Sequence, residues 1–336
     1  MVELDEIILD WLISKTWEYQ TLALPNPSVG ALVVDSKGAI LSCSFHQKSG
    51  EAHAELEAVR EALEGLGVLQ ESKNFNAWEL YERILSSHNG ALRGCQIYCT
   101  LEPCNHEGKT PSCSKLLANV GIKKVIYAHK DPTPCASGGG EYLRACGVEV
   151  VECLREGAED LLYPFLCLQT KGHFNLYKIA QRLNGNYKGG QISSPLSKAF
   201  THTQRGVAQS LIISGKTILN DKPRLDLRCA FRKDREEIPI KILTTQNLVP
   251  KDYECIASSN ISIHYNTHTL GLESGFNLIE GGYVLLESLR DELDCLLLLY
   301  SPSFEGESER VARKLELKVL HTQKLQGGDV ALWLRP

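Results

Sequence analysis

The sequence has no apolar segment long enough to cross a bilayer, because its longest apolar runs, such as residues 296–299, have only the length of a strand. It also lacks a basic leader followed by an apolar core, since acidic and apolar residues alternate with helical spacing over residues 1–14. We therefore expect an amphipathic helix there, no membrane segment and a cytoplasmic protein.

Positive charge is also scarce, because 36 lysines and arginines are outnumbered by 41 aspartates and glutamates, giving a net charge of -5. This balance provides no basic field that would attract nucleic acid or an anionic membrane. We therefore expect neither partner, and a small-molecule substrate instead. There is no repeat of fixed period and no low-complexity tract.

A length of 336 residues predicts two domains, because one domain typically has roughly 100 to 200 residues. The sequence becomes polar at residues 169–172, and apolar alternation restarts at residue 176. We therefore predict one domain over residues 1–170 and a second over residues 171–336.

Strands and helices alternate in the first domain, which is typical of an α/β fold. We expect helices over residues 53–64, 77–85 and 114–119 and strands over residues 28–34, 39–45, 96–100, 124–129 and 148–153. In the second domain we expect strands over residues 176–180, 210–213, 238–244, 261–265, 276–279, 294–300 and 329–334.

Twelve cysteines without a secretion signal indicate reduced thiols, among which a clustered pair more often binds metal than forms a disulfide. The sharpest motif is His-Ala-Glu at residues 53–55, followed by Cys104 and Cys113. One imidazole and two thiolates fill three corners of a tetrahedral zinc site and leave the fourth for water. Bound zinc makes hydroxide available at neutral pH by lowering the pKa of that water toward about 7.

We therefore predict one zinc ion on His53, Cys104 and Cys113, with Glu55 as the catalytic residue that moves protons. Residues two apart do not share a helix face, so His53 and Glu55 should lie at the leading edge of their helix. Cys113 should begin a helix, where the dipole favours a thiolate. A purely structural zinc would need a fourth protein ligand, for which His106 and Cys99 are available, and would leave Glu55 without a role.

The joint pattern is similar to the signature of the zinc-dependent nucleobase deaminases, His-x-Glu followed by Pro-Cys and a second cysteine. Its eight-residue gap resembles the deaminase part of the bifunctional riboflavin biosynthesis deaminase/reductase family. Further matching blocks are Asn-Pro-Ser-Val-Gly at residues 26–30, His46 with Gly50, and the loop over residues 131–138. The resemblance implies a cytidine-deaminase-like three-layer α/β/α domain that binds a phosphorylated pyrimidine.

The resemblance also implies that Asn26, His46 and Lys109 contact the substrate. An Asn amide pairs with donors and acceptors of a pyrimidine edge, and a Lys ammonium suits a ribose phosphate. Two departures are visible: Thr133 stands where the family usually has Asn, and residues 56–93 form a longer segment than expected. The rim of the pocket is therefore expected to differ.

The second half resembles the reductase partner of the same family, which implies a dihydrofolate-reductase-like α/β domain that uses NADPH. Residues 217–228 match Thr-x-x-x-Asp-x-Pro-x-Leu-x-x-Arg, and Glu-Gly-Gly at residues 280–282 follows an apolar strand and opens a helix. The implied cofactor contacts are Thr217, Asp221 and Gly282, and the implied substrate contacts are Arg205, Leu225, Arg228 and Glu280. No G-x-G-x-x-G fingerprint is present, and this fold does not require one.

Departures are larger in this half. Arg-Leu-Asn-Gly at residues 182–185 replaces the usual Ser-Leu-Asp-Gly, and Gln191 stands where a tryptophan is expected. Taken over both halves, the resemblance implies a homo-oligomeric enzyme that deaminates 2,5-diamino-6-ribosylamino-pyrimidinone 5'-phosphate and then reduces the ribosyl side chain. Two alternatives stay open: a deaminase with a degenerate reductase-like domain, and a tRNA base deaminase, which the acidic charge and the cysteine spacing oppose.

Overall fold

The computed structural model describes residues 3–70, 75–232, 235–244, 261–265 and 274–336. The chain divides into two compact units, Met1–Leu162 and Tyr163–Pro336. The division falls inside helix α6 (Glu156–Lys171), at whose end the sequence places the domain boundary. None of the helices in the described ranges combines the length and the apolar character that a bilayer span needs.

Unit 1 contains a five-stranded sheet with the order β2-β1-β3-β4-β5. Strand β1 pairs antiparallel with β2 and β3, whereas β3, β4 and β5 run parallel. The strands are β1 (Gly30–Val34), β2 (Ile40–Phe45), β3 (Gln96–Cys99), β4 (Lys124–Tyr127) and β5 (Glu149–Glu152). All five strands expected in this half are confirmed.

The turn between β1 and β2 is stabilised by the side chain of Asp35. The Asp35 carboxylate accepts hydrogen bonds from the backbone N–H groups of Lys37 and Ala39, both at 2.8 Å. Gly38 has a φ of 89°, a left-handed conformation that glycine adopts without steric cost. This turn fixes the register in which Leu32 pairs with Cys43.

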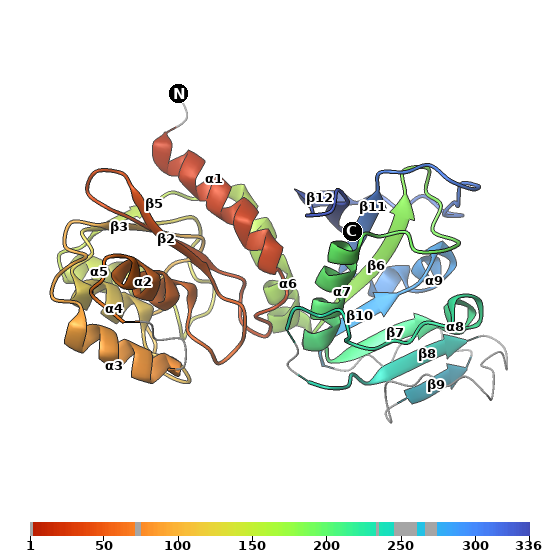
Figure 1. Ribbon diagram of the computed structural model, residues 1–336, viewed down its shortest axis with the longest axis horizontal. Coiled ribbons are helices and arrows are strands. Elements are labelled where there is room, and N and C mark those ends of the chain that lie inside the picture. Colours follow the sequence, from red (N-terminus) through yellow and green to blue (C-terminus); the bar gives the residue numbers. More distant parts are fainter. Residues whose placement is uncertain (1–2, 71–74, 233–234, 245–260, 266–273) are drawn as a thin grey trace. The chain divides into compact units, whose positions relative to one another are not determined.

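Helices cover both faces of this sheet (Figure 1). Helix α1 (Leu4–Thr16) packs on one face of the sheet, where a Cβ atom on Gly30 would meet the Thr16 and Leu12 side chains of the helix. Helix α2 (Ala54–Gly65) packs on the opposite face, where the Ser42 hydroxyl donates to the Ala58 carbonyl at 2.6 Å. The unit also contains η1 (Trp17–Tyr19), α3 (Ala77–Ser87), α4 (Cys113–Val120), α5 (Gly139–Ala145) and the start of α6.

Helix α2 forms where it was expected because its apolar residues recur on one side. Leu56, Val59 and Leu63 are spaced three and four residues apart, and all are buried. Burying one such side chain stabilises the fold by roughly 1.5 to 3 kcal/mol. The same stripe holds the first turn of α2, with His53 and Glu55, above the sheet.

Unit 2 contains an eight-stranded sheet with the order β12-β13-β11-β6-β10-β7-β8-β9. The strands from β11 to β9 run parallel, and β13 and β12 add an antiparallel edge. They are β6 (His173–Arg182), β7 (Ser210–Ser214), β8 (Ile240–Thr244), β9 (Ile261–Tyr265), β10 (Gly275–Glu280), β11 (Cys295–Ser301), β12 (Lys318–Lys324) and β13 (Val330–Arg335). The seven expected strands are confirmed, and β12 is an additional one.

In the described part of unit 2, helices α7 (Pro195–Val207), α8 (Gly215–Asp221) and α9 (Tyr283–Ser288) connect strands, with η2 (Arg290–Glu292) after α9. Helix α8 lies beyond the arrowhead of β7 (Figure 1), and α9 follows the neighbouring strand β10. The carboxyl ends of parallel strands share one edge of a sheet, so both helices begin at the same edge. The core beneath them includes Tyr177, Ile212 and Ile279.

A close backbone approach fixes the loop between β3 and α4. A Cβ atom on Gly139, the first residue of α5, would lie only 1.8 Å from the Pro103 carbonyl oxygen. Helix α5 therefore supports the backbone immediately before Cys104, and only glycine leaves room for this contact.

We predict that Gly139→Ala destabilises the chain by at least about 1 to 3 kcal/mol, because the Pro103 backbone must move to accept the methyl group. Denaturant unfolding of the purified protein measures this loss. Gly65→Ala is the control: a Cβ at this helical position meets nothing within 4 Å, so stability should stay constant or rise by up to about 1 kcal/mol. Equal stability of the two variants would contradict the close contact.

Candidate active site

Three segments of unit 1 bring the zinc motif together. His53 is the N-cap of α2, Cys113 is the first residue of α4, and Cys104 lies in the loop after β3. Within the described ranges these residues form a possible metal-binding group, with ligand atoms within 4.8 Å of one another. The expected positions of His53, Glu55 and Cys113 at the starts of their helices are confirmed. Neither His106 nor Cys99 belongs to this group.

The geometry of the three donors fits zinc. The His53 Nδ1 atom lies 3.6 Å from the Cys104 Sγ atom and 3.5 Å from the Cys113 Sγ atom. Tetrahedral zinc with bonds of about 2.05 Å to nitrogen and about 2.3 Å to sulfur separates those ligands by about 3.6 Å. The site therefore has the dimensions of a tetrahedral zinc centre with three protein ligands.

The orientation of His53 is set by a residue that the sequence did not single out. Its Nε2 atom lies 3.1 Å from the Thr110 Oγ1 atom, while Nδ1 faces the two sulfurs. With Nδ1 as the metal ligand, the Nε2–H group donates to Thr110, the usual second contact of a ligating histidine. The zinc motif gave no indication of this role, because Thr110 is not one of the motif positions and merely lies between the two cysteines.

The thiol of Cys104 has a lowered pKa. The main cause is a hydrogen bond from the Cys113 thiol, followed by His53, which together outweigh the opposing effect of burial. The Cys113 backbone N–H, at the start of α4, also points at Cys104 Sγ over 3.5 Å. Donors and a helix N-terminus thus favour a thiolate here, which is the form that binds metal.

Glu55 is almost completely buried, with 3% of its surface exposed, beside this donor group. Burial raises the pKa of Glu55 to about 7, and negative charge on Cys104 acts in the same direction. A carboxyl with a pKa near neutrality can both take up and release a proton during turnover. This is the property expected of a proton shuttle.

Asn26 and His46 lie next to the metal group. The Asn26 Nδ2 atom donates to His46 Nε2 over 3.1 Å, and His46 Nδ1–H donates to the Ala52 carbonyl at 3.0 Å. The His46 ring meets the His53 ring edge to face, with centroids 5.1 Å apart. Both of these predicted substrate contacts are therefore brought to the site, whereas the third, Lys109, is exposed on the loop between β3 and α4.

A buried carboxylate organises the loop that begins at residue 131 and the start of α5 that follows it. The Glu102 side chain accepts hydrogen bonds from the backbone N–H groups of Gly140 at 2.8 Å and Asp131 at 3.1 Å. Thr133, the residue that departs from the family pattern, donates its hydroxyl to Asp131. Glu102 was not identified as functional from the sequence.

The predicted cofactor contacts of unit 2 lie on the two helices that begin at one edge of its sheet. Thr217 is in the first turn of α8, where its hydroxyl lies 2.8 Å from the Ser214 hydroxyl. Asp221 ends α8 and is exposed, and burial of part of its carboxyl raises its pKa. Gly282 is the N-cap of α9.

The predicted substrate contacts of unit 2 differ in their surroundings. Arg205 and Glu280 form a buried bidentate ion pair, with N–O distances of 2.7 and 2.8 Å. Burial opposes ionisation of Glu280, but Arg205 and then Lys178 lower its pKa well below the ordinary range. Arg228 is exposed and paired with Asp226, and Leu225 is buried with a φ of 53°.

The residues that depart from the reductase pattern form hydrogen bonds with the surrounding backbone and with Asn186. Arg182 is buried and donates to the carbonyl groups of Lys188 and Gly189 and to Asn186 Oδ1. A Cβ on Gly282 would lie 2.4 to 2.5 Å from the Tyr187 ring, so this ring covers the N-cap of α9. Asn184 donates to backbone carbonyls at residues 305 and 306, and Gln191 donates to the Ser193 carbonyl.

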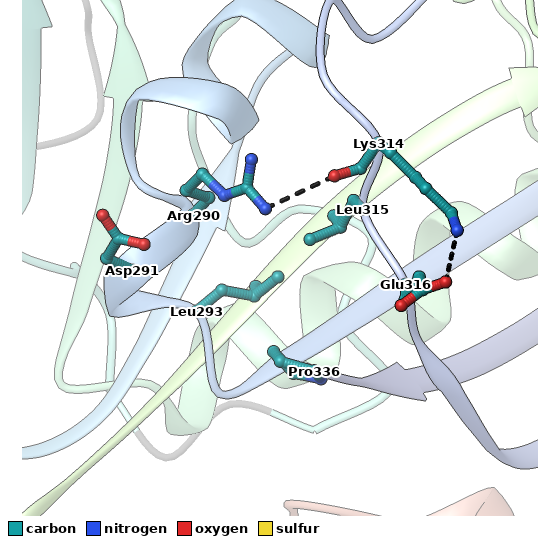
Figure 2. Close-up of a pocket in the computed structure, with 7 residues that line it drawn as sticks. All are labelled: Arg290, Asp291, Leu293, Lys314, Leu315, Glu316 and Pro336. Atoms are coloured by element: carbon teal, nitrogen blue, oxygen red, sulfur yellow. Dashed lines mark hydrogen bonds and ion pairs between the residues drawn. The ribbon is translucent and has the colours of Figure 1, made fainter.

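A surface hollow of about 460 Å³ lies elsewhere in unit 2 (Figure 2). It is lined by Arg290, Asp291, Leu293, Lys314, Leu315, Glu316 and Pro336. Arg290 donates to the Lys314 carbonyl across it at 3.4 Å. None of the predicted site residues lines this hollow, so we assign it no role in substrate or cofactor binding.

Comparison with known proteins agrees with the site. Residues 5–129 match the family "Cytidine and deoxycytidylate deaminase zinc-binding region". The riboflavin biosynthesis protein RibD of Aquifex aeolicus is 30% identical over 254 residues, which are 73% of this chain and 63% of that protein. RibD of Corynebacterium ammoniagenes is 29% identical over 238 residues, 69% of this chain and 63% of that protein. The matches thus cover less than two thirds of these relatives.

Solved structures extend the likeness in fold to both units. A Thermotoga maritima diaminohydroxyphosphoribosylaminopyrimidine deaminase/5-amino-6-(5-phosphoribosylamino)uracil reductase matches with a TM-score of 0.65 at 24% identity, covering 99% of this chain and 98% of that one. RibD of Acinetobacter baumannii matches with a TM-score of 0.61 at 22% identity and the same coverage. The fold is therefore a cytidine-deaminase-like domain followed by a dihydrofolate-reductase-like domain. The chain is therefore similar in sequence to riboflavin biosynthesis proteins named RibD, and its ordered pair of folds matches their solved structures over nearly the whole chain.

Proposed function

We propose that the chain catalyses two consecutive steps of riboflavin synthesis: hydrolytic deamination of 2,5-diamino-6-ribosylamino-pyrimidinone 5'-phosphate, then reduction of the ribosyl side chain of the product to ribityl. The observation that carries the proposal is the zinc-sized group of His53, Cys104 and Cys113 with the buried carboxyl of Glu55 beside it. In this proposal the chain acts in the cytoplasm as a homo-oligomer on a small phosphorylated pyrimidine.

The residues of unit 1 suit the deamination step. Zinc, when bound, supplies a Lewis acid that makes water nucleophilic at neutral pH. Glu55 then accepts a proton from the attacking water and delivers one to the leaving amine, for which a pKa near 7 is well matched. Thr110 holds His53 in the tautomer that leaves Nδ1 free to bind the metal.

Asn26, His46 and Lys109 are proposed to recognise the substrate. Asn26 and His46 form a hydrogen-bonded pair beside His53. The Asn26 amide combines donor and acceptor groups, which suits the edge of a pyrimidine ring, and His46 holds this amide in place. Lys109 is an exposed cation on the neighbouring loop, which suits the ribose phosphate.

For the reductase step we propose that NADPH binds along the edge of the sheet where α8 and α9 begin, with Thr217, Asp221 and Gly282 as its contacts. The position supports this assignment, because ligands of open α/β sheets bind beyond the carboxyl ends of the strands. The cofactor supplies the hydride. Arg205, Leu225, Arg228 and Glu280 are proposed to bind the substrate, although Arg205 and Glu280 form a pair with each other.

A second candidate function is deamination alone, with unit 2 as a degenerate reductase. Tyr187 lies against Gly282, and the segment that carries it is tied down by Arg182. NADPH would have to displace this ring to reach the backbone of Gly282. This contact is the observation that favours the second candidate.

One assay separates the two candidates. Purified protein is incubated with the diaminopyrimidine ribosylamine phosphate, and ammonia release and NADPH loss are followed in parallel. Release of ammonia together with loss of NADPH supports the bifunctional enzyme. Ammonia without NADPH loss identifies a deaminase with a degenerate partner unit, and neither signal from metal-loaded protein refutes the proposed substrate.

We predict that Glu55→Gln lowers the rate of ammonia release by about 10²- to 10⁴-fold, because an amide cannot carry the proton. Zinc content and thermal stability should remain at the level of the unmodified protein. Glu57→Gln, two residues later on the same helix and paired with Arg60, is the matched control with unchanged release. Retention of more than about a tenth of the activity in Glu55→Gln would remove Glu55 from this role.

We predict that Thr217→Val raises the Kd for NADPH about three- to tenfold, since the substitution removes one hydroxyl and keeps the side-chain volume. Fluorescence titration measures the affinity, and ammonia release should not change. Thr170→Val, which removes a hydroxyl bonded to the Leu166 carbonyl on α6, should leave the Kd unaltered. The same Kd in Thr217→Val and the unmodified chain would exclude Thr217 as a contact.

A further inference from the structure

Helix α3 belongs to the long segment over residues 56–93, and the zinc motif gives it no role. Its Asn76 cap forms a reciprocal capping box with Glu79, and Ala77, Leu80 and Ile84 are buried. The capping box and the buried face anchor α3 to unit 1 as a fixed element. Its exposed side can therefore hold a neighbouring loop in place.

The exposed side of α3 contacts the loop between the two cysteines. The indole Nε1–H of Trp78 donates a hydrogen bond to the Gly108 carbonyl at 3.3 Å. The Trp78 ring is further fixed by an edge contact with Tyr81, with centroids 6.0 Å apart. Gly108 is the residue before Lys109.

The far side of Lys109 is fixed as well. The Gly108 N–H donates to the Thr110 carbonyl at 3.1 Å, and the Thr110 side chain bonds His53. On the preceding side of the loop, Glu107 pairs with Lys115 of α4 at 2.9 Å. Among these contacts, the hydrogen bond from Trp78 comes from a residue outside the zinc motif and binds the loop at Gly108, directly before Lys109.

We propose that Trp78 is a positioning residue that holds the Gly108 carbonyl and thereby keeps the Lys109 ammonium in place for the substrate phosphate. This inference rests on the proposed function, in which Lys109 meets that phosphate. Trp78 therefore affects substrate binding, because it contacts the loop backbone that carries Lys109. The proton-transfer residue Glu55 and the metal donors are held by other contacts.

The first test is Trp78→Phe, which removes the N–H donor and retains an aromatic ring. The KM for the phosphorylated pyrimidine should rise about three- to tenfold, the range for loss of one hydrogen bond, with kcat and zinc content unchanged. Trp11→Phe makes the same chemical change at an exposed position of α1 and should leave KM unaltered. An unchanged KM in Trp78→Phe, or a loss confined to kcat, overturns the proposal.

A double-mutant cycle shows whether the effect passes through Lys109. In a Lys109→Met background, Trp78→Phe should raise KM by less than about twofold, because the cation that it positions is gone. The same small effect is expected for a substrate without its phosphate. Full additivity of the two substitutions would show that Trp78 acts independently of Lys109, which contradicts the proposal.

A measurement without substrate separates this inference from the proposed function. Trypsin cleaves after lysine, so Trp78→Phe should speed cleavage after Lys109 relative to the unmodified chain and to Trp11→Phe. Faster cleavage in a protein that releases no ammonia would locate the error in the substrate assignment. Unchanged cleavage would refute the positioning role, whatever the kinetics show.

Discussion

Unit 1 depends on one constraint: an imidazole and two thiols from separate segments must meet at ligand distance in a buried position. The starts of α2 and α4 and the loop after β3 satisfy it together. Burying the Cys104 thiolate is costly unless donors compensate, and the Cys113 thiol and backbone N–H supply them. The Cys104 carbonyl is fixed in turn by Ser112 and Ser114, which donate to it at 3.1 Å.

The sequence was sufficient to predict the metal donors and the elements that carry them, because each has a local signal. Apolar spacing predicts α2, and the order His-x-Glu, Pro-Cys, Cys fixes the chemistry of the site. Thr110 and Glu102 were not predicted, since their roles come from contacts 57 and 38 residues away along the chain, with His53 and Gly140. Sequence spacing holds no information on such pairs.

Prediction was less complete in unit 2 for the same physical reason. Its seven expected strands are present, but β12 is polar and half-exposed, so its apolar pattern is too weak to identify it. The Arg205–Glu280 pair joins α7 to the end of β10, 75 residues apart. Resemblance assigned both residues to the substrate, and only the fold reveals that each also neutralises the other.

This pair constrains how the second unit could bind a phosphorylated substrate. If a phosphate took Arg205 as its partner, the buried Glu280 carboxylate would lose the charge that compensates it. Binding of the phosphate by Arg205 therefore requires another partner for Glu280. Lys178, 3.5 Å from Glu280, is such a partner within the same cluster. Exchange of Arg205 between Glu280 and a phosphate therefore keeps both buried charges paired, which makes the ion pair compatible with substrate binding as well as with stability.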